Sequence, residues 1–344
     1  MNLYDANGYL DFSQIIKTGD YIFVIGARGI GKTFGALKYA IDNTDHFILM
    51  RRTQAQADMI KSEGLNPFNS LHRVLGDDYL FLIKPVAKNI GGIYQKKILE
   101  DHEELRPRGY LMALSTISNI RGFDASDTDL VIYDEFIGEK HEKPIKYEGQ
   151  AFLNAVETIA RNRELEGRPP MKILCMANSS DLANPIFIEL GLVKIVEKMI
   201  RKNIECVMLP ERHISIIMPT MTPISIAKYN TSLYQMAGAS TFKEMAIGNE
   251  FTLDFTEMIR SMSLKDFKPL VAVGEIVIYS HKSDLLYYVT GHMSGHPEIY
   301  GTSEVDIRRF ANQYYYLRLS YLNRHIYFES YILQVLFEKY FKMR

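Results

Sequence analysis

Eight consecutive residues near the start of the chain have the types and spacing of a phosphate-binding loop, G-x-x-x-x-G-K-[ST]. These residues are Gly26, Ala27, Arg28, Gly29, Ile30, Gly31, Lys32 and Thr33. Glycines let successive backbone N–H groups point at phosphate oxygens at the start of a helix. Lys32 would reach the β- and γ-phosphates, and the Thr33 hydroxyl would coordinate Mg²⁺. A short pattern can match by chance, but an apolar strand-like run precedes it and a helical pattern follows, so we predict an ATP and Mg²⁺ site.

Two adjacent carboxylates end another apolar run about a hundred residues later. Asp134 and Glu135 follow the residues Leu-Val-Ile-Tyr at 130–133, and open α/β sheets bind ligands at the carboxyl ends of their strands. Asp134 would hold Mg²⁺, and Glu135 would activate the attacking water. The pair could also merely begin a solvated loop, but together with the phosphate-binding loop it favours an ATPase of the additional-strand class over a small GTPase.

Phosphoryl transfer also needs positive charge near the γ-phosphate in the transition state, which makes four arginines candidates. Arg161 and Arg163 lie at the end of a predicted helix, and Arg121 lies before the strand that carries Asp134. Any of these three could reach the nucleotide of a neighbouring subunit in a ring, although an arginine at a helix end also suits the helix dipole. Arg28 could touch phosphate within its own subunit or simply fill a variable position of the loop.

A further polar residue, Asn178, follows the apolar run 173–177. That run should form the strand beside the phosphate-binding loop. Asn178 could therefore sense the γ-phosphate or place the attacking water. Capping of the next helix is an equally good interpretation.

The elements that must position these residues alternate between strand-like and helix-like patterns. The expected strands cover residues 21–25, 46–50, 110–114, 129–133 and 171–177, the expected helices cover 32–41 and 148–164, and a hairpin is expected over 79–84 and 93–99. Apolar strands separated by helices predict a mostly parallel, three-layer α/β sheet of the RecA-like P-loop NTPase type.

The pattern changes after about residue 200. Prolines at 210, 219 and 223 disfavour a central strand, so we expect an ATPase domain over 1–212, a linker over 213–240 and a smaller α+β domain over 241–344. In the last domain, strands are expected near 271–279 and 285–290, and helices near 305–319 and 323–341.

Composition restricts the function classes. The 344 residues contain 40 Lys and Arg against 41 Asp and Glu, a formal net charge of -1, whereas proteins that coat nucleic acid by bulk charge are strongly basic. Two cysteines give no disulfide framework. The longest apolar stretch, 214–227, is short and contains two prolines, so we expect no membrane span and an intracellular protein.

Several of these motifs, taken in order, resemble the genome-packaging (encapsidation) ATPases of φ29-like phages, which are terminase-like P-loop motors. The resemblance is carried by residues 23–32, Arg51-Arg52, 134–137, 161–164 and Asn178. It is specific over about 20–190 and weak beyond.

The resemblance implies a pentameric ring on the portal of a procapsid, in the host cytoplasm, that drives double-stranded DNA inward with ATP. It implies that Arg161 is an arginine finger acting on the neighbouring subunit and that Arg121 also reaches across the interface. It further implies a C-terminal domain with a vestigial RNase H-like nuclease fold, and we find no convincing set of metal-binding acids there. Some relatives bind a packaging RNA with this domain, and the sequence leaves that open.

Three alternatives differ from a packaging motor. A helicase or other P-loop DNA translocase is disfavoured because no Q-x-x-G-R-x-x-R motif is present. A metabolite kinase is disfavoured because Glu135 suits water as the acceptor. A nuclease-competent large terminase would reveal itself by metal-dependent DNA cleavage.

Overall fold

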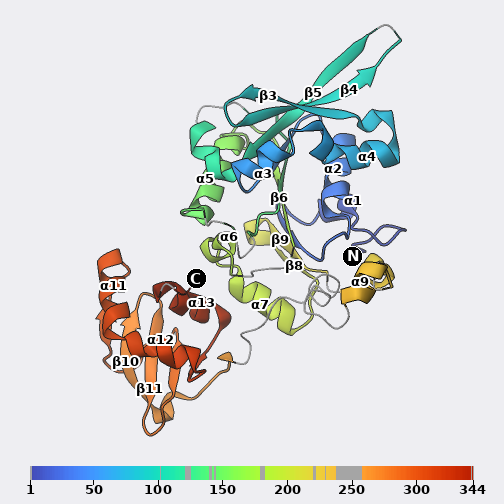
Figure 1. Cartoon of the computed structure of the whole chain (residues 1–344). Coiled ribbons are helices and arrows are strands. Elements are labelled where there is room, and N and C mark those ends of the chain that lie inside the picture. The colour runs from blue at the N-terminus through green and yellow to red at the C-terminus, as the bar shows by residue number, and fades with distance from the viewer. Residues whose placement is uncertain are drawn as a thin grey trace. The chain divides into compact units, whose positions relative to one another are not determined.

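The computed structural model describes residues 2–100, 102–120, 125–138, 142, 145–178, 183–219, 222–228, 230–237, 258–341 and 343. The chain divides into two compact units, one of Met1–Leu190 with Lys198–Phe251 and one of Gly191–Glu197 with Thr252–Arg344 (Figure 1). In the described residues, no helix is long and apolar enough to cross a membrane.

The first unit is built on a nine-stranded sheet with the order β3-β4-β5-β2-β6-β7-β1-β9-β8. Its central strands, from β5 to β9 in that order, pair in parallel, which confirms the predicted α/β sheet. They are β1 (Tyr21–Ile25), β2 (Phe47–Arg51), β5 (Glu103–Ala113), β6 (Leu130–Asp134), β7 (Lys172–Ala177) and β9 (Ile214–Ile217).

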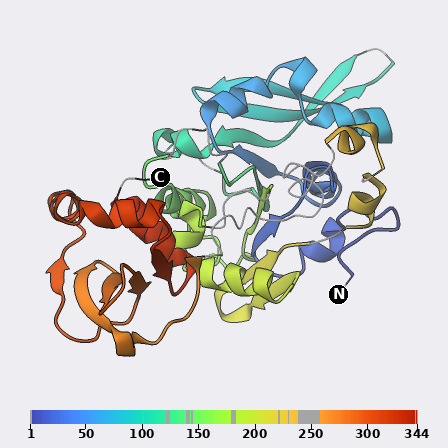
Figure 2. The ribbon, with the colours of Figure 1, turned by 60° about the horizontal axis from the view of Figure 1, so that its bottom comes forward.

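Antiparallel strands flank this parallel core at both edges. β3 (Phe81–Ala87) and β4 (Ile90–Ile98) form the predicted hairpin, and β4 pairs in turn with β5. β8 (Cys206–Leu209) pairs with β9 at the other edge. The far halves of β4 and β5 extend beyond β2 as a two-stranded ribbon (Figures 1 and 2).

Helices cover both faces of the sheet, because alternate residues of each strand point to opposite faces. Ile22 and Val24 of β1 belong to the core cluster that α1, α2 and α4 complete. Phe23, between them, packs edge-on against Phe187 of α6, with 5.2 Å between ring centroids. The helices of this unit are α1 (Phe12–Ile15), α2 (Lys32–Asn43), α3 (Gln54–Met59), α4 (Phe68–Leu75), α5 (Glu148–Ala160), α6 (Pro185–Glu189), α8 (Pro223–Lys228) and α9 (Ser232–Ala237), while α7 (Val193–Arg201) crosses the division between the units.

The structure differs from the sequence prediction where a linker was expected over 213–240. Residues Ile214–Ile217 form β9, which is wholly buried and pairs with β1. Prolines bound the elements of this segment instead of breaking them: Pro219 follows β9, and Pro223 occupies the first position of α8, where a missing N–H costs nothing. The segment therefore belongs to the first unit at least as far as Ala237.

The second unit contains a five-stranded sheet with the order β13-β10-β11-β12-β14 and, in the described residues after β13, three α-helices, of which only the last follows β14; these elements are those of a small α+β domain. Its elements are β10 (Phe267–Val273), β11 (Ile276–His281), β12 (Tyr287–Thr290), β13 (Glu298–Tyr300), α11 (Glu304–Gln313), α12 (Tyr315–Leu322), β14 (Ile326–Phe328) and α13 (Tyr331–Tyr340).

Three element boundaries in this unit differ from the prediction. The strand expected near 271–279 is two strands joined by a turn at Gly274, which has a φ of +54°. The helix expected over 305–319 is interrupted at Tyr314. The last expected helix begins as strand β14, because Ile326 and Phe328 alternate into the core.

Candidate nucleotide-binding site

The phosphate-binding loop connects β1 to α2 at the carboxyl edge of the parallel sheet. Gly29 and Gly31 have φ values of +72° and +87°, which only glycine adopts without strain. Gly31 is the N-cap of α2, so the first free N–H groups of that helix face the loop. β7 lies next to β1, as predicted, and β6 follows it in the sheet. The loop, Asn178 and the Asp134-Glu135 pair consequently share one edge.

Lys32 folds back over this loop. Its Nζ donates hydrogen bonds to the carbonyl oxygens of Gly26 and Ala27, both at 2.7 Å, and to Oδ1 of Asn178 at 3.1 Å. Burial lowers the pKa of Lys32 to about 7, although the nearby Asp134 carboxylate opposes the shift. Asn178 therefore contacts the loop lysine directly, which fits a role beside the phosphates.

The lowered pKa of Lys32 predicts that ATP binding takes up a proton. Above pH 7 the Lys32 side chain of the nucleotide-free protein is mostly a neutral amine. The phosphates of a bound nucleotide favour its charged, protonated form. We expect an uptake approaching one proton per MgATP at pH 8 and almost none at pH 6. Calorimetry in buffers of different ionisation enthalpy measures this uptake. Lys32→Arg is the control, since a guanidinium stays charged; equal uptake by that variant would contradict the assignment.

Thr33 and Asp134 lie together at the site. The Thr33 hydroxyl donates to Oδ2 of Asp134 at 3.0 Å. A hydroxyl and a carboxylate are hard oxygen ligands of the kind that Mg²⁺ prefers, usually alongside substrate phosphates and water. The two side chains thus fit the metal-holding role expected from the sequence.

Arg51, at the end of β2, contacts both acidic residues. Its Nη1 donates to Oδ2 of Asp134 at 2.8 Å, and its Nη2 donates to Oε2 of Glu135 at 2.5 Å. No role was expected for Arg51 from the sequence, although its place at the end of an expected strand was a usable signal. A cation that bonds both carboxylates holds their side chains in fixed positions.

Glu135 has a strained backbone and a half-exposed carboxylate. Its φ is +58°, a conformation that non-glycine residues rarely adopt and that is often found at functional sites. Burial raises the pKa of Glu135, while the Arg51 guanidinium opposes the shift. A carboxylate with a raised pKa is a stronger base, which suits proton abstraction from water.

These residues line a pocket of about 450 Å³. Its wall includes Ser70 of α4 and Pro67, the N-cap of that helix, neither of which was expected from the sequence. The other lining residues are Arg28, Gly29, Gly31, Lys32, Thr33, Phe34, Asp134, Glu135, Ala177 and Asn178.

The two arginines after α5 have different environments. Arg163 is buried, and it donates to the carbonyl oxygens of Thr128 and Pro169 and to Oδ1 of Asp129, so it ties this turn to the amino edge of the sheet. Arg161 is exposed and is the C-cap of α5, with a φ of +48°. The contacts of Arg163 place this turn at the amino edge of the sheet, whereas the phosphate-binding loop follows the carboxyl end of β1. Arg121 lies outside the described residues.

The other end of α5 is fixed beside the site. Arg52, which directly follows the end of β2 at Arg51, donates to both carboxylate oxygens of Glu148, the first residue of α5, at 2.6 and 3.0 Å. It also donates to Glu142 at 2.9 Å. Arg52 and Glu148 are both almost fully buried, and a buried bidentate pair of this kind fixes the orientation of both partners.

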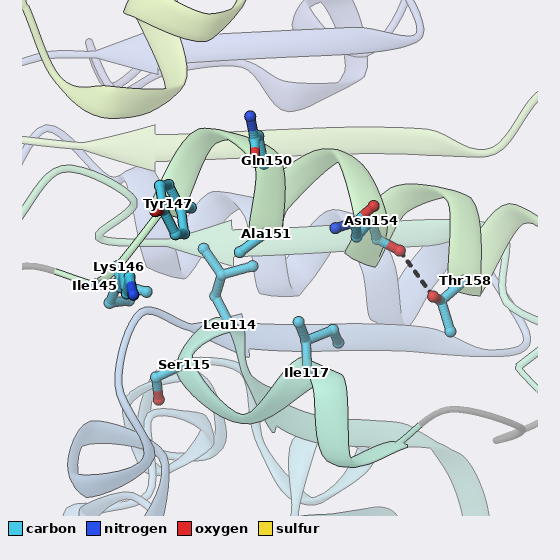
Figure 3. Close-up of a pocket in the computed structure, with 10 residues that line it drawn as sticks. All are labelled: Leu114, Ser115, Ile117, Ile145, Lys146, Tyr147, Gln150, Ala151, Asn154 and Thr158. Carbon is cyan, nitrogen blue, oxygen red and sulfur yellow. Dashed lines mark hydrogen bonds between the residues drawn. The ribbon is translucent and has the colours of Figure 1, made fainter. Parts of the chain in front are cut away.

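A second pocket, of about 300 Å³, lies between α5 and the short helix η3 (Leu114–Ile120). Figure 3 shows Gln150, Ala151 and Asn154 along α5, opposite Leu114 and Ile117. Among the described residues that line it, Lys146 is the one charged side chain. These described residues include neither a glycine-rich loop nor a carboxylate, so the first pocket fits a nucleotide better.

Comparison with known proteins gives consistent matches over most of the chain. A sequence model of the Podovirus DNA encapsidation protein (Gp16) family matches residues 3–290. The DNA packaging protein of Bacillus phage B103 is 26% identical, over 94% of this chain and 97% of its own. The DNA packaging protein of Bacillus phage phi29 is 24% identical, over 99% of this chain and 98% of its own.

Solved structures show the same fold. A chain of the bacteriophage Phi-29 genome packaging motor assembly superimposes with a TM-score of 0.66 at 18% identity, covering 98% of this chain and 100% of its own. A chain of the Phi-28 DNA packaging motor gives a TM-score of 0.62 at 17% identity, with 98% of both chains covered.

Proposed function

The chain belongs to the Podovirus DNA encapsidation protein (Gp16) family, and on this premise we propose that it is an ATP-hydrolysing motor that drives double-stranded DNA into a phage procapsid. One observation carries the ATPase part of this proposal. Lys32, Thr33, Asp134 and Glu135 meet at one sheet edge, where Arg51 donates hydrogen bonds to both acidic side chains.

The hydrolysis step follows from these positions. The loop N–H groups and Lys32 would hold the β- and γ-phosphates, and Thr33 and Asp134 would hold Mg²⁺, which would supply positive charge to the phosphates. Glu135 accepts a proton from the attacking water. Asn178, bonded to Lys32, lies where it can orient that water or the γ-phosphate.

We further propose that Arg161 completes the site of a neighbouring subunit in a ring, which we expect to be a pentamer. Its place at the amino edge supports this role because its own phosphate-binding loop lies at the opposite edge. We expect Arg121 to reach across the same interface. The expected partners are the portal of the procapsid, DNA and, for some family members, a packaging RNA; the expected location is the host cytoplasm.

The second unit has no assigned chemistry in this proposal. We expect it to be an inactive relative of RNase H-like nucleases that binds nucleic acid or the portal. In the described residues, no group of three or more histidine, cysteine or acidic side chains is arranged to hold a metal ion. Two-metal nucleases need such groups, so we expect the DNA to stay intact.

Hydrolysis of ATP by the purified protein, with Mg²⁺ and with or without double-stranded DNA, tests the proposal. We expect hydrolysis that DNA stimulates and DNA that remains uncut on a gel. Lys32→Ala is the control that should lose hydrolysis in both conditions. An equal rate of hydrolysis with and without DNA would favour a kinase-like enzyme. Metal-dependent cleavage of the DNA would favour a nuclease-competent terminase.

A further inference from the structure

A lysine from the segment after the sheet contacts the phosphate-binding loop. Lys228 is the last residue of α8, and its Nζ donates to the carbonyl oxygen of Arg28 at 2.8 Å. The same ammonium lies against Gly29, where a Cβ would come within 1.8 Å of it. The side chain therefore rests on the turn of the loop and uses the space that a glycine leaves open.

The helix that carries Lys228 is well anchored. Its first turn is closed by a hydrogen bond from the Ser225 N–H to the Thr222 hydroxyl at 3.1 Å, and both residues are buried. Ile224 packs against the main core cluster of the first unit. These contacts hold α8 in place, and so they position the side chain of Lys228 against the phosphate-binding loop.

The charge around the loop is suited to a polyphosphate. Burial lowers the pKa of Lys228, and the positive charges of Lys228 and Arg28 help burial to lower the pKa of Lys32. Cations this close in a partly dehydrated site repel one another. Phosphate groups placed among them would remove that repulsion, because each oxygen could accept a charge-assisted hydrogen bond.

We propose that Lys228 is a phosphate-binding residue of this site. When ATP occupies the loop, the ammonium exchanges the Arg28 carbonyl for an oxygen of the β- or γ-phosphate. The proposal rests on the ATPase function proposed above and adds to that site a cation from the segment that follows β9.

Binding of a non-hydrolysable fluorescent ATP analogue with Mg²⁺ tests the proposal at low salt. We expect Lys228→Gln to weaken binding about tenfold, the order of a charge-assisted hydrogen bond in a partly exposed site. Lys228→Arg should bind nearly as well as the wild type, because the positive charge remains. The loss in Lys228→Gln should shrink at high salt, as for any exposed charge. Lys17→Gln is the matched control, since Lys17 is exposed and lies near the amino edge of the sheet.

Unchanged or tighter binding by Lys228→Gln would overturn the proposal; tighter binding would show that the contact with Arg28 competes with the nucleotide. An equal loss of affinity in Lys228→Arg would also overturn the proposal, because it would show that the packing of the lysine side chain, and not its charge, matters for binding. Lys32→Ala separates this proposal from the proposed function: if that variant binds the analogue as well as the wild type, the nucleotide site itself is wrong, whatever Lys228 does.

Discussion

Replacement of Glu135 by Gln should abolish ATP turnover while leaving ATP binding nearly unchanged. The amide has the shape of the carboxylate but cannot accept a proton from water, and loss of a general base typically lowers kcat by about 10²- to 10⁴-fold. Glu135 has no part in the loop that cradles the phosphates, and its contact is with Arg51. Steady-state phosphate release and binding of a fluorescent ATP analogue measure the two quantities separately.

Glu166→Gln is the matched control for this experiment. Glu166 is exposed in the turn after α5, near the amino edge, and its replacement should change neither quantity. Retained steady-state hydrolysis in Glu135→Gln would refute the role of Glu135 as the base. A parallel loss of binding would show instead that Glu135 holds the site together through Arg51.

Replacement of Arg161 by Ala should lower hydrolysis by the assembled ring about 10³- to 10⁵-fold, the range typical of arginine fingers. The guanidinium would stabilise the transition-state charge on the nucleotide of the adjacent subunit, so each active site would lose a group that its own chain does not supply. ATP binding by the isolated subunit should remain. Arg168→Ala, in the same turn, is the control and should retain activity.

Mixed rings decide whether Arg161 acts on the neighbour. Subunits with Glu135→Gln keep Arg161 but cannot hydrolyse ATP, whereas subunits with Arg161→Ala keep an intact base. Each variant alone should be inactive. A mixture should recover part of the activity, because some Arg161→Ala sites then adjoin a subunit that still donates an arginine. No recovery in verified mixed rings would exclude action between subunits.

The nucleotide loop and its sheet could be predicted from sequence because their signals are local. The types and spacing of residues 26–33 indicate a phosphate-binding loop without reference to the rest of the chain. The apolar runs at 21–25 and 130–133 predict buried strands directly. The expected neighbour relation between Asn178 and the loop also held, since β7 pairs with β1. Parallel sheets bring strand ends together at one edge, so order along the chain was informative.

Residues that join the site through long-range contacts could not be predicted in this way. Arg51 is 83 residues from Asp134, and Lys228 is 200 residues from Arg28. Neither contact has a local pattern. Pro219 and Pro223 also misled the prediction, because proline excludes a strand only at the positions it occupies, and β9 ends before the first of them. Its four buried residues were a strand signal that the neighbouring prolines obscured.

The attachment of α5 at its first turn couples the position of this helix to that of β2. Arg51 is the last residue of β2 and Arg52 follows it directly, so the arginine that contacts Asp134 and Glu135 and the arginine that contacts Glu148 share one stretch of backbone. From Glu148, thirteen helical residues lead to Arg161, about 20 Å away at the helical rise of 1.5 Å per residue. A rod of this length does not bend easily. Any shift of the end of β2 would therefore reach Arg161 as a displacement of the whole helix, and in the ring proposed above it would move the residue proposed to act on the neighbouring site.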